Sequence, residues 1–344
     1  MDAVRFSLAG SAKTLLHASV EWPIAMRARL FLAMLSLTLA PGIGLAHDIV
    51  LGPQRLSAHC WFFQGESGVA SLANKGFMSN AGFVVTGNGV VIFDALGTPA
   101  LGRAMREAIR TVTDEPIRRI VVSHYHADHI YGLQELKTTG TDIWAHAKAK
   151  RYFASGQAAE RLAQRRLDLA PWVDESTRVV PADLWLDGDT DFRLGEITFR
   201  LLYSGAAHSP EDMLMYVVED RVLFAGDLIF AGRVPFVGAA DSRSWLAALN
   251  KTLALSPPPI AVVPGHGAAS RDPVRDMALT RDYLIYLRES MGRAVRDLEP
   301  FEDAYAKTDW SRFKSLPAFE AANRINAYGT YLLLEEEELR SAKP

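Results

Sequence analysis

Three histidines and one aspartate lie within six residues, directly after an apolar run that is typical of a buried strand. The segment SHYHADHIYG covers residues 123–132 and follows Ile120-Val121-Val122. Imidazole and carboxylate groups this close together indicate a metal site. The fold must then bring ligands from other segments to the end of this strand.

Three other strand-like segments are each followed by a candidate ligand among small residues. These ligands are His208 in SGAAHSPED after residues 199–203, Asp227 in LFAGDLIF after 222–224, and His266 in VVPGHG after 260–263. Glycines beside Asp227 and His266 allow the backbone to approach closely. We therefore predict that four strands end in ligands that meet at one place.

A first ion is expected at His124, His126 and His208. The first two histidines are two residues apart, so in extended chain they can point the same way and reach one ion. Neutral imidazole suits Zn²⁺, and a catalytic zinc site keeps one position open for water.

A second ion is expected at Asp128, His129 and His266, with Asp227 as the bridge between the two ions. We predict Asp128 and Asp227 as the catalytic carboxylates. Two metal ions can share a hydroxide, because metal binding lowers the pKa of water from about 15.7 to about 7. The predicted cofactor is a pair of Zn²⁺ ions.

Composition limits the partners. The formal net charge is -3, so no basic surface favours nucleic acid, and a small-molecule substrate is expected. The chain has a single cysteine, Cys60, which excludes an intramolecular disulfide and a thiolate metal cluster. The sequence does not determine an oligomeric state.

Residues 1–46 are predicted to be a signal peptide region. Met26-Arg27-Ala28-Arg29 precedes the apolar run 30–40, and small residues follow up to Ala46. Translation from Met26 is a further hypothesis, and an uncleaved amphipathic anchor is the alternative. Cleavage before His47 would give a periplasmic or secreted protein with no stable membrane association.

Strand and helix patterns alternate in the rest of the chain, which predicts helices covering the faces of sheets. Strand-rich pieces on both sides of the middle indicate two facing sheets with helices outside. We expect a catalytic domain over residues 47–270 and a helical extension over 271–344 that packs on it.

The ordered motifs His-x-His-x-Asp-His, a distant His, Gly-Asp and Gly-His-Gly resemble the metallo-β-lactamase superfamily. The resemblance runs from about Cys60 to Gly267 and implies an α/β fold, the αββα sandwich, with a metal cleft along the sheet edges. It implies the ligand roles given above. It also implies that Asp94, in VIFDALG, supports the histidine loop from behind the ligands.

Within the superfamily the chain is most similar to the quinoprotein relay system zinc metallohydrolases and the glyoxalase II-like group. Asp227 stands where the cysteine-ligand β-lactamases have a cysteine, and the histidine-only branch usually lacks this bridging aspartate. We find no match to the glutathione-binding residues of glyoxalase II in the C-terminal helices.

The expected function is hydrolysis of a small thioester, lactone, ester or β-lactam-like amide by a metal-bridging hydroxide. A mononuclear Fe(II) enzyme similar to persulfide dioxygenases is one alternative, and a non-catalytic metal-binding protein is another. Metal analysis distinguishes the zinc hydrolase from the Fe(II) enzyme. A non-catalytic metal-binding protein would need no open coordination position.

Overall fold

The computed structural model describes residues 49–238 and 240–341. The predicted signal region, residues 1–46 with Met26, lies outside the described residues. The described residues belong to one compact unit. No helix in the described part of the chain is both long enough and apolar enough to cross a membrane.

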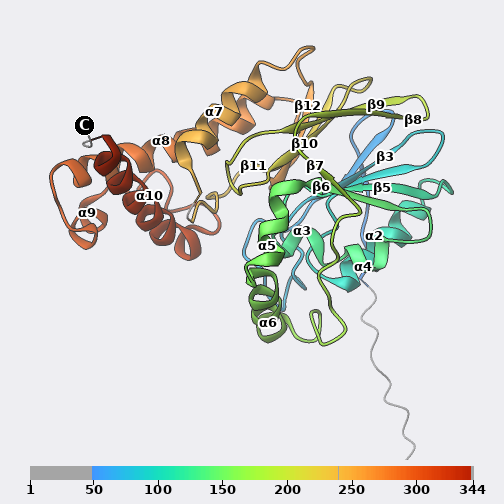
Figure 1. Cartoon of the computed structure of the whole chain (residues 1–344), viewed down its shortest axis with the longest axis horizontal. Coiled ribbons are helices and arrows are strands. Elements are labelled where there is room, and N and C mark those ends of the chain that lie inside the picture. Colours follow the sequence, from blue (N-terminus) through green and yellow to red (C-terminus); the bar gives the residue numbers. More distant parts are fainter. Residues whose placement is uncertain (1–48, 239, 342–344) are drawn as a thin grey trace, which may run out of the picture. The chain divides into compact units, whose positions relative to one another are not determined.

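The first sheet contains seven strands that neighbour one another in chain order (Figure 1). Strands β1 to β4 pair antiparallel, and β4 to β7 pair parallel. Their bounds are β1 Gln54–Arg55, β2 Cys60–Phe63, β3 Ala81–Val85, β4 Val90–Phe93, β5 Ile117–Val121, β6 Asp142–His146 and β7 Leu184–Leu186.

The second sheet contains five strands in the order β12-β11-β10-β9-β8. All pairs are antiparallel except β11 and β12, which run parallel. Their bounds are β8 Thr190–Leu194, β9 Ile197–Tyr203, β10 Met213–Val217, β11 Val222–Phe230 and β12 Ala261–His266.

The helices follow the strands in three groups. The first group, after β4 and β5, is α2 Pro99–Arg110, α3 Ala127–Ile130 and α4 Leu133–Leu136. The second group, after β6, is the 3₁₀ turn η1 Ala147–Ala149, α5 Lys150–Ala154 and α6 Gln157–Leu169. The third group is α7 Ser242–Leu253, α8 Pro273–Arg296, α9 Phe301–Lys307 and α10 Phe319–Ser341.

The two sheets face each other because their strands alternate between two apolar environments. In β4, Val91 and Phe93 point into the core between the sheets, whereas Val90 and Ile92 point towards α2 to α6. In the second sheet, alternate residues of β11 join a third core with α7 to α10. The architecture is therefore the predicted αββα arrangement of two mixed sheets with helices outside, plus C-terminal helices (Figure 1).

Three local predictions were inaccurate. The charged pattern of residues 148–169 is typical of a single helix, but the structure breaks it at Gly156, which adopts a left-handed φ of 81° that a helix cannot continue through. Strand β7 was not predicted, because three residues give too short a pattern. Strand β11 runs to Phe230 instead of ending at Phe224.

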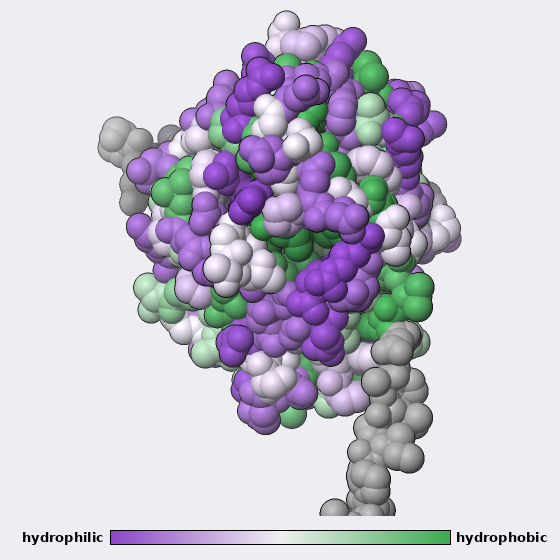
Figure 2. Space-filling model, turned by 90° about the vertical axis from the view of Figure 1, so that its right-hand side faces the viewer, coloured by the Kyte–Doolittle hydropathy of each residue, from purple (hydrophilic) through white to green (hydrophobic). Residues whose placement is uncertain are grey.

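The surface opposite the C-terminal helices carries mainly hydrophilic residues, and hydrophobic residues show between them (Figure 2). The predicted domain boundary at 270 stays a prediction.

Candidate metal centre

The segment 123–132 supplies four polar side chains at the end of β5. His124 lies between β5 and α3, and His126 has β-region dihedral angles as the residue that precedes α3. Asp128 and His129 lie in the first turn of α3. The chain reversal after β5 therefore turns two pairs of side chains towards different parts of one centre.

The other three candidate ligands come from the second sheet and its loops. His208 lies between β9 and β10, as expected, but Asp227 lies inside β11 and His266 is the last residue of β12. These two positions correct the prediction that both follow their strands. The register of β11 against β12 shifts at Gly226, and a Cβ atom at Gly265 would lie 2.0 Å from Oδ1 of Asp227.

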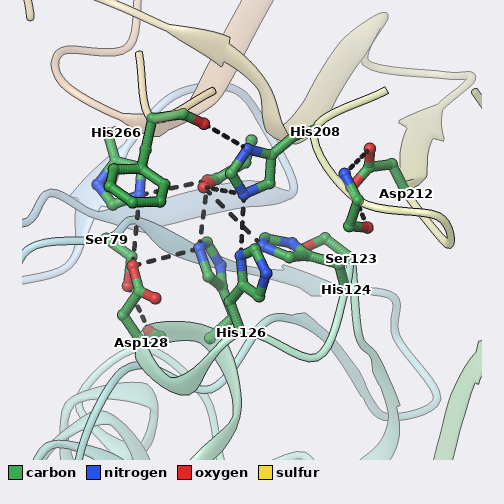
Figure 3. A network of polar contacts seen from close by, with 12 residues as sticks. Ser79, Ser123, His124, His126, Asp128, His208, Asp212 and His266 are labelled. Carbon is green, nitrogen blue, oxygen red and sulfur yellow. Dashed lines mark hydrogen bonds and ion pairs between the residues drawn. The ribbon is translucent and has the colours of Figure 1, made fainter. Parts of the chain in front are cut away.

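The first donor group contains His124, His126, His208 and Asp227, with donor atoms all within 4.8 Å of one another. Nε2 of His208 lies 2.9 Å from Nδ1 of His126 and 3.3 Å from Oδ2 of Asp227. Nε2 of His124 lies 3.9 Å from the same oxygen. Figure 3 shows the histidine rings directed at one centre.

The second donor group contains Asp128, His129 and His266. Oδ2 of Asp128 lies 3.3 Å from Nε2 of His266 and 3.5 Å from Nε2 of His129. The other oxygen of Asp227, Oδ1, lies 3.2 Å from His129 and 3.3 Å from His266. One carboxylate therefore offers Oδ2 to the first group and Oδ1 to the second.

Asp94 orients two of the histidines from behind. Its Oδ2 accepts hydrogen bonds from Nδ1 of His129 (2.8 Å) and from Oγ of Ser123 (2.7 Å), and Oγ of Ser123 lies 3.0 Å from Nδ1 of His124. Its Oδ1 accepts the Ser123 amide at 2.7 Å. Asp94 is buried and has a left-handed φ of 61°, a strained conformation that the surroundings must enforce.

Backbone carbonyls orient two more histidines. Nδ1 of His208 donates to the Phe236 carbonyl at 2.9 Å, and Nδ1 of His266 donates to the Met78 carbonyl at 2.8 Å. A carbonyl only accepts, so the hydrogen sits on Nδ1 and the lone pair of Nε2 faces the centre. His126 differs, since it directs Nδ1 inwards.

The pKa values follow from burial and from the opposite charges. Burial lowers the pKa of His124 well below its usual value and that of His126 to about 3. Burial alone would raise the pKa of Asp227, but His266 and His129 hold it well below the usual range. Burial opposes protonation of His129, yet Asp227 and the other nearby carboxylates raise its pKa. A cation at the second group would therefore displace protons.

The donor set fits a metal ion. Nε2 of His124, Nε2 of His129 and Oδ1 of Asp227 are buried and have no hydrogen-bond partner in the described residues. Orphaned buried polar atoms are costly and need an explanation. Two donors on one tetrahedral zinc, each about 2.0–2.1 Å from it, stand roughly 3.3 Å apart. The distances in the second group are 3.2–3.5 Å, and those in the first group are 2.9–3.9 Å.

Two supporting residues were not predicted. Ser123 directly precedes the motif, and its position beside His124 was the only signal. Arg233 is buried, its Nη1 donates to the Gly68 carbonyl at 2.7 Å and lies 3.3 Å from Nδ1 of His266. Burial lowers the pKa of this guanidinium, while nearby carboxylates oppose the shift. Nothing in the sequence around Arg233 indicates this position.

A cavity of about 720 Å³ opens beside the first donor group. His126 and His208 of the first donor group line it. The other lining residues come from η1, α5 and α6 and from the loops 206–211 and 236–241. A small molecule in this cavity can therefore reach the first donor group.

Two facing mixed sheets, outer helices and a histidine–aspartate centre at their edge define a metal-binding αββα protein. The family model of the Metallo-beta-lactamase superfamily matches residues 74–266, more than half of the chain. The chain therefore belongs to the metallo-β-lactamase superfamily.

Individual proteins show the same relation. The chain is 24% identical over 193 residues to a probable metallo-hydrolase, YqgX, of Bacillus subtilis, which covers 55% of this chain and 85% of the relative. It is 22% identical over 239 residues to a linear primary-alkylsulfatase of Pseudomonas sp., which covers 60% of this chain and 45% of the relative. These matches place the chain among the metal-dependent hydrolases.

A solved structure shares the fold over a longer stretch. The inverting sec-alkylsulfatase Pisa1 of Pseudomonas sp. matches with a TM-score of 0.66 at 16% identity and covers 83% of this chain. This chain spans about half the length of both alkylsulfatases, 45% and 50%.

Proposed function

We propose that the protein is a dinuclear zinc hydrolase, exported to the periplasm, that cleaves a small thioester, lactone, ester or β-lactam-like amide. The single observation that carries this proposal is the position of Asp227. Its two oxygens lie 3.2–3.3 Å from histidine nitrogens of both donor groups, which is the arrangement of a bridging carboxylate.

Each donor group would hold one ion, and Asp227 would contact both. When bound, a pair of zinc ions supplies a nucleophile at neutral pH and polarises the scissile carbonyl. The chain itself keeps the ligands rigid, because Asp94 and two backbone carbonyls fix the tautomers of four histidines. The cavity beside His126 and His208 positions the substrate.

Metal analysis and a substrate screen test this proposal together. Protein purified without added metal should contain close to two zinc ions per chain and hydrolyse at least one carbonyl class among thioesters, lactones and nitrocefin-type β-lactams. One iron per chain with oxygen uptake would overturn it in favour of the Fe(II) alternative. Export is tested by N-terminal sequencing of the secreted protein, where a mature chain that starts well before His47 contradicts cleavage.

Sulfate ester hydrolysis is a second candidate. It is favoured by the similarity to two alkylsulfatases, one of which matches this fold over 83% of the chain. Sulfate release from octyl sulfate, included in the same screen, separates it from carbonyl hydrolysis. Inertness towards octyl sulfate, with turnover of a carbonyl substrate, would reject this second candidate.

A further inference from the structure

The wall of the cavity formed by α5 and α6 carries unpaired positive charge. Lys148, Arg151 and Arg161 line the cavity from this side, and all three are exposed. Within the described residues, the guanidinium groups of Arg151 and Arg161 make no ion pair or hydrogen bond. The Lys148 ammonium lies 2.6 Å from the Tyr203 hydroxyl, a neutral partner.

Three carboxylates also line the cavity, but two of them accept hydrogen bonds from backbone amides, and none forms an ion pair with these three cations. The Asp241 carboxylate accepts hydrogen bonds from the Arg243 and Ser244 amides at the start of α7. Glu211 is buried and faces the Tyr125 amide at 3.4 Å. Glu160 is the one exposed carboxylate among the described lining residues that remains, against three cations.

Apolar side chains also line the cavity, from the loops 206–211 and 236–241. Phe236 is 44% exposed, a high value for a large aromatic side chain, and Ala207 and Val237 are further apolar lining residues. Histidine, apolar and cationic side chains therefore all line the cavity, and we call Lys148, Arg151 and Arg161 its cationic rim.

We propose that the cationic rim binds an oxyanion group of the substrate, a carboxylate, sulfonate or sulfate, that lies away from the bond to be cleaved. The substrate is then an anionic molecule with an apolar segment between its charge and its reactive group. Arg151 and Arg161 are the specificity-determining residues, because a guanidinium binds a planar or tetrahedral oxyanion through paired N–H donors. The substrate assignment rests on the proposed hydrolase function, whereas binding of the anion does not.

The kinetic test compares two esters that differ only in charge, 4-nitrophenyl hydrogen succinate and its methyl ester. The R151Q/R161Q double variant should lower kcat/KM for the anionic ester about tenfold, mainly through KM, and leave the methyl ester unchanged. The matched control is R103Q/R110Q on α2, where both arginines are exposed and lie outside the cavity. Equal losses on both esters would overturn the proposal.

A binding test needs no turnover. Octanesulfonate, which cannot be hydrolysed as an ester, should bind the zinc-loaded wild-type protein in calorimetry, more weakly at high salt. R151Q/R161Q should weaken this binding about tenfold, and R103Q/R110Q should not. No binding to the wild-type protein, or equal binding to both variants, would overturn the proposal. If octanesulfonate binds but no ester is hydrolysed, the proposed hydrolase function is contradicted and the anion-binding proposal is not.

The position of the anion is tested by octyl sulfate. The charge of octyl sulfate lies at the bond to be cleaved. If the cationic rim binds an anion distant from that bond, the rate of sulfate release by R151Q/R161Q should stay within about twofold of the wild-type rate. A tenfold fall in sulfate release would place the recognised anion at the reacting end and overturn the assigned geometry.

Discussion

Asp227 is the side chain on which both donor groups depend. It is buried, and its oxygens divide between the groups, with Oδ2 near His208 and Oδ1 near His129 and His266. Four nearby imidazoles hold it in one orientation, and Gly265 leaves the space that its Oδ1 occupies. A residue with one donor atom could serve only one of the two groups.

Replacement of Asp227 by Ala should therefore lower metal content from about two ions to one or fewer and remove hydrolysis. The fold should remain, because the two sheets and their cores do not depend on this carboxylate. Metal content by mass spectrometry and circular dichroism check both statements. The exposed Asp114, replaced by Ala, is the control. Activity near the wild-type level in D227A would show that Asp227 does not bridge.

The seven candidate ligands could be predicted because they are side chains, histidine and aspartate, whose residue types the sequence gives directly. It predicted Asp94 only through the resemblance to the superfamily. The groups that orient His208 and His266 are the carbonyls of Phe236 and Met78. Every residue has a carbonyl, so no sequence pattern can indicate which one accepts a given hydrogen bond.

At the scale of elements, the turn between β10 and β11 is tied to the start of β2 at the end of the sheets remote from the metal centre. Asp220 in this turn accepts hydrogen bonds from the His59 amide at 2.9 Å and from Nδ1 of His59 at 2.8 Å, and also from the Ser57 hydroxyl. Burial would raise the pKa of Asp220, but these donors lower it below the ordinary value. This ionised carboxylate thus adds a polar link between the two sheets at this end.

The stability of this junction should depend on pH. The unfolded chain binds the Asp220 proton more tightly than the folded chain, so the contribution is complete above the unfolded pKa of about 3.9 and is lost as pH falls through the lower folded value. Asp220→Asn should cost about 1–3 kcal/mol of unfolding free energy at pH 7. The difference from wild type should shrink below about pH 4.

Urea unfolding at pH 7 and at pH 3 measures this difference, with the exposed Asp114→Asn as the control. If D220N lowers the unfolding free energy equally at both pH values, the junction does not depend on the negative charge of Asp220.

Most elements could be predicted from their apolar pattern, because a short continuous apolar run bounded by glycine or asparagine indicates a strand covered on both faces, as in β3 and β4. The break at Gly156 and the extension of β11 could not. A glycine inside a charged helical pattern is compatible with either a helix or a turn, and β11 continues only because β12 pairs with it beyond Gly226.

At the scale of the molecule, one buried side chain of the C-terminal helices holds the loop that orients His208. Nδ2 of Asn326, in α10, donates to the Pro235 carbonyl at 2.7 Å, and its Oδ1 accepts the Val237 amide at 2.8 Å. These bonds hold both sides of Phe236, whose carbonyl orients His208. Val237 and Pro235 lie 89 and 91 residues from Asn326 in the sequence. The sequence pattern therefore predicted the helix α10 but not its contact with this loop.

We therefore expect Asn326 to affect metal binding. Asn326→Asp keeps the shape of the side chain but replaces the donor to the Pro235 carbonyl with an oxygen that repels it. The variant should lose about 1–3 kcal/mol of stability, and its affinity for zinc should fall about tenfold because His208 is no longer held. Competition with a chromophoric chelator measures the affinity.

The control for that experiment is Leu334→Ala, further along the same helix. Leu334 packs in the same core as Phe230 and Trp245, and its truncation should cost about 2–5 kcal/mol. Its apolar side chain makes none of the hydrogen bonds that hold the loop at Phe236, so zinc affinity should stay at the wild-type value although stability falls. If L334A and N326D weaken zinc binding to the same extent, the helices act on the metal centre only through overall stability. If N326D alone weakens it, the extension is part of the machinery that orients the ligands.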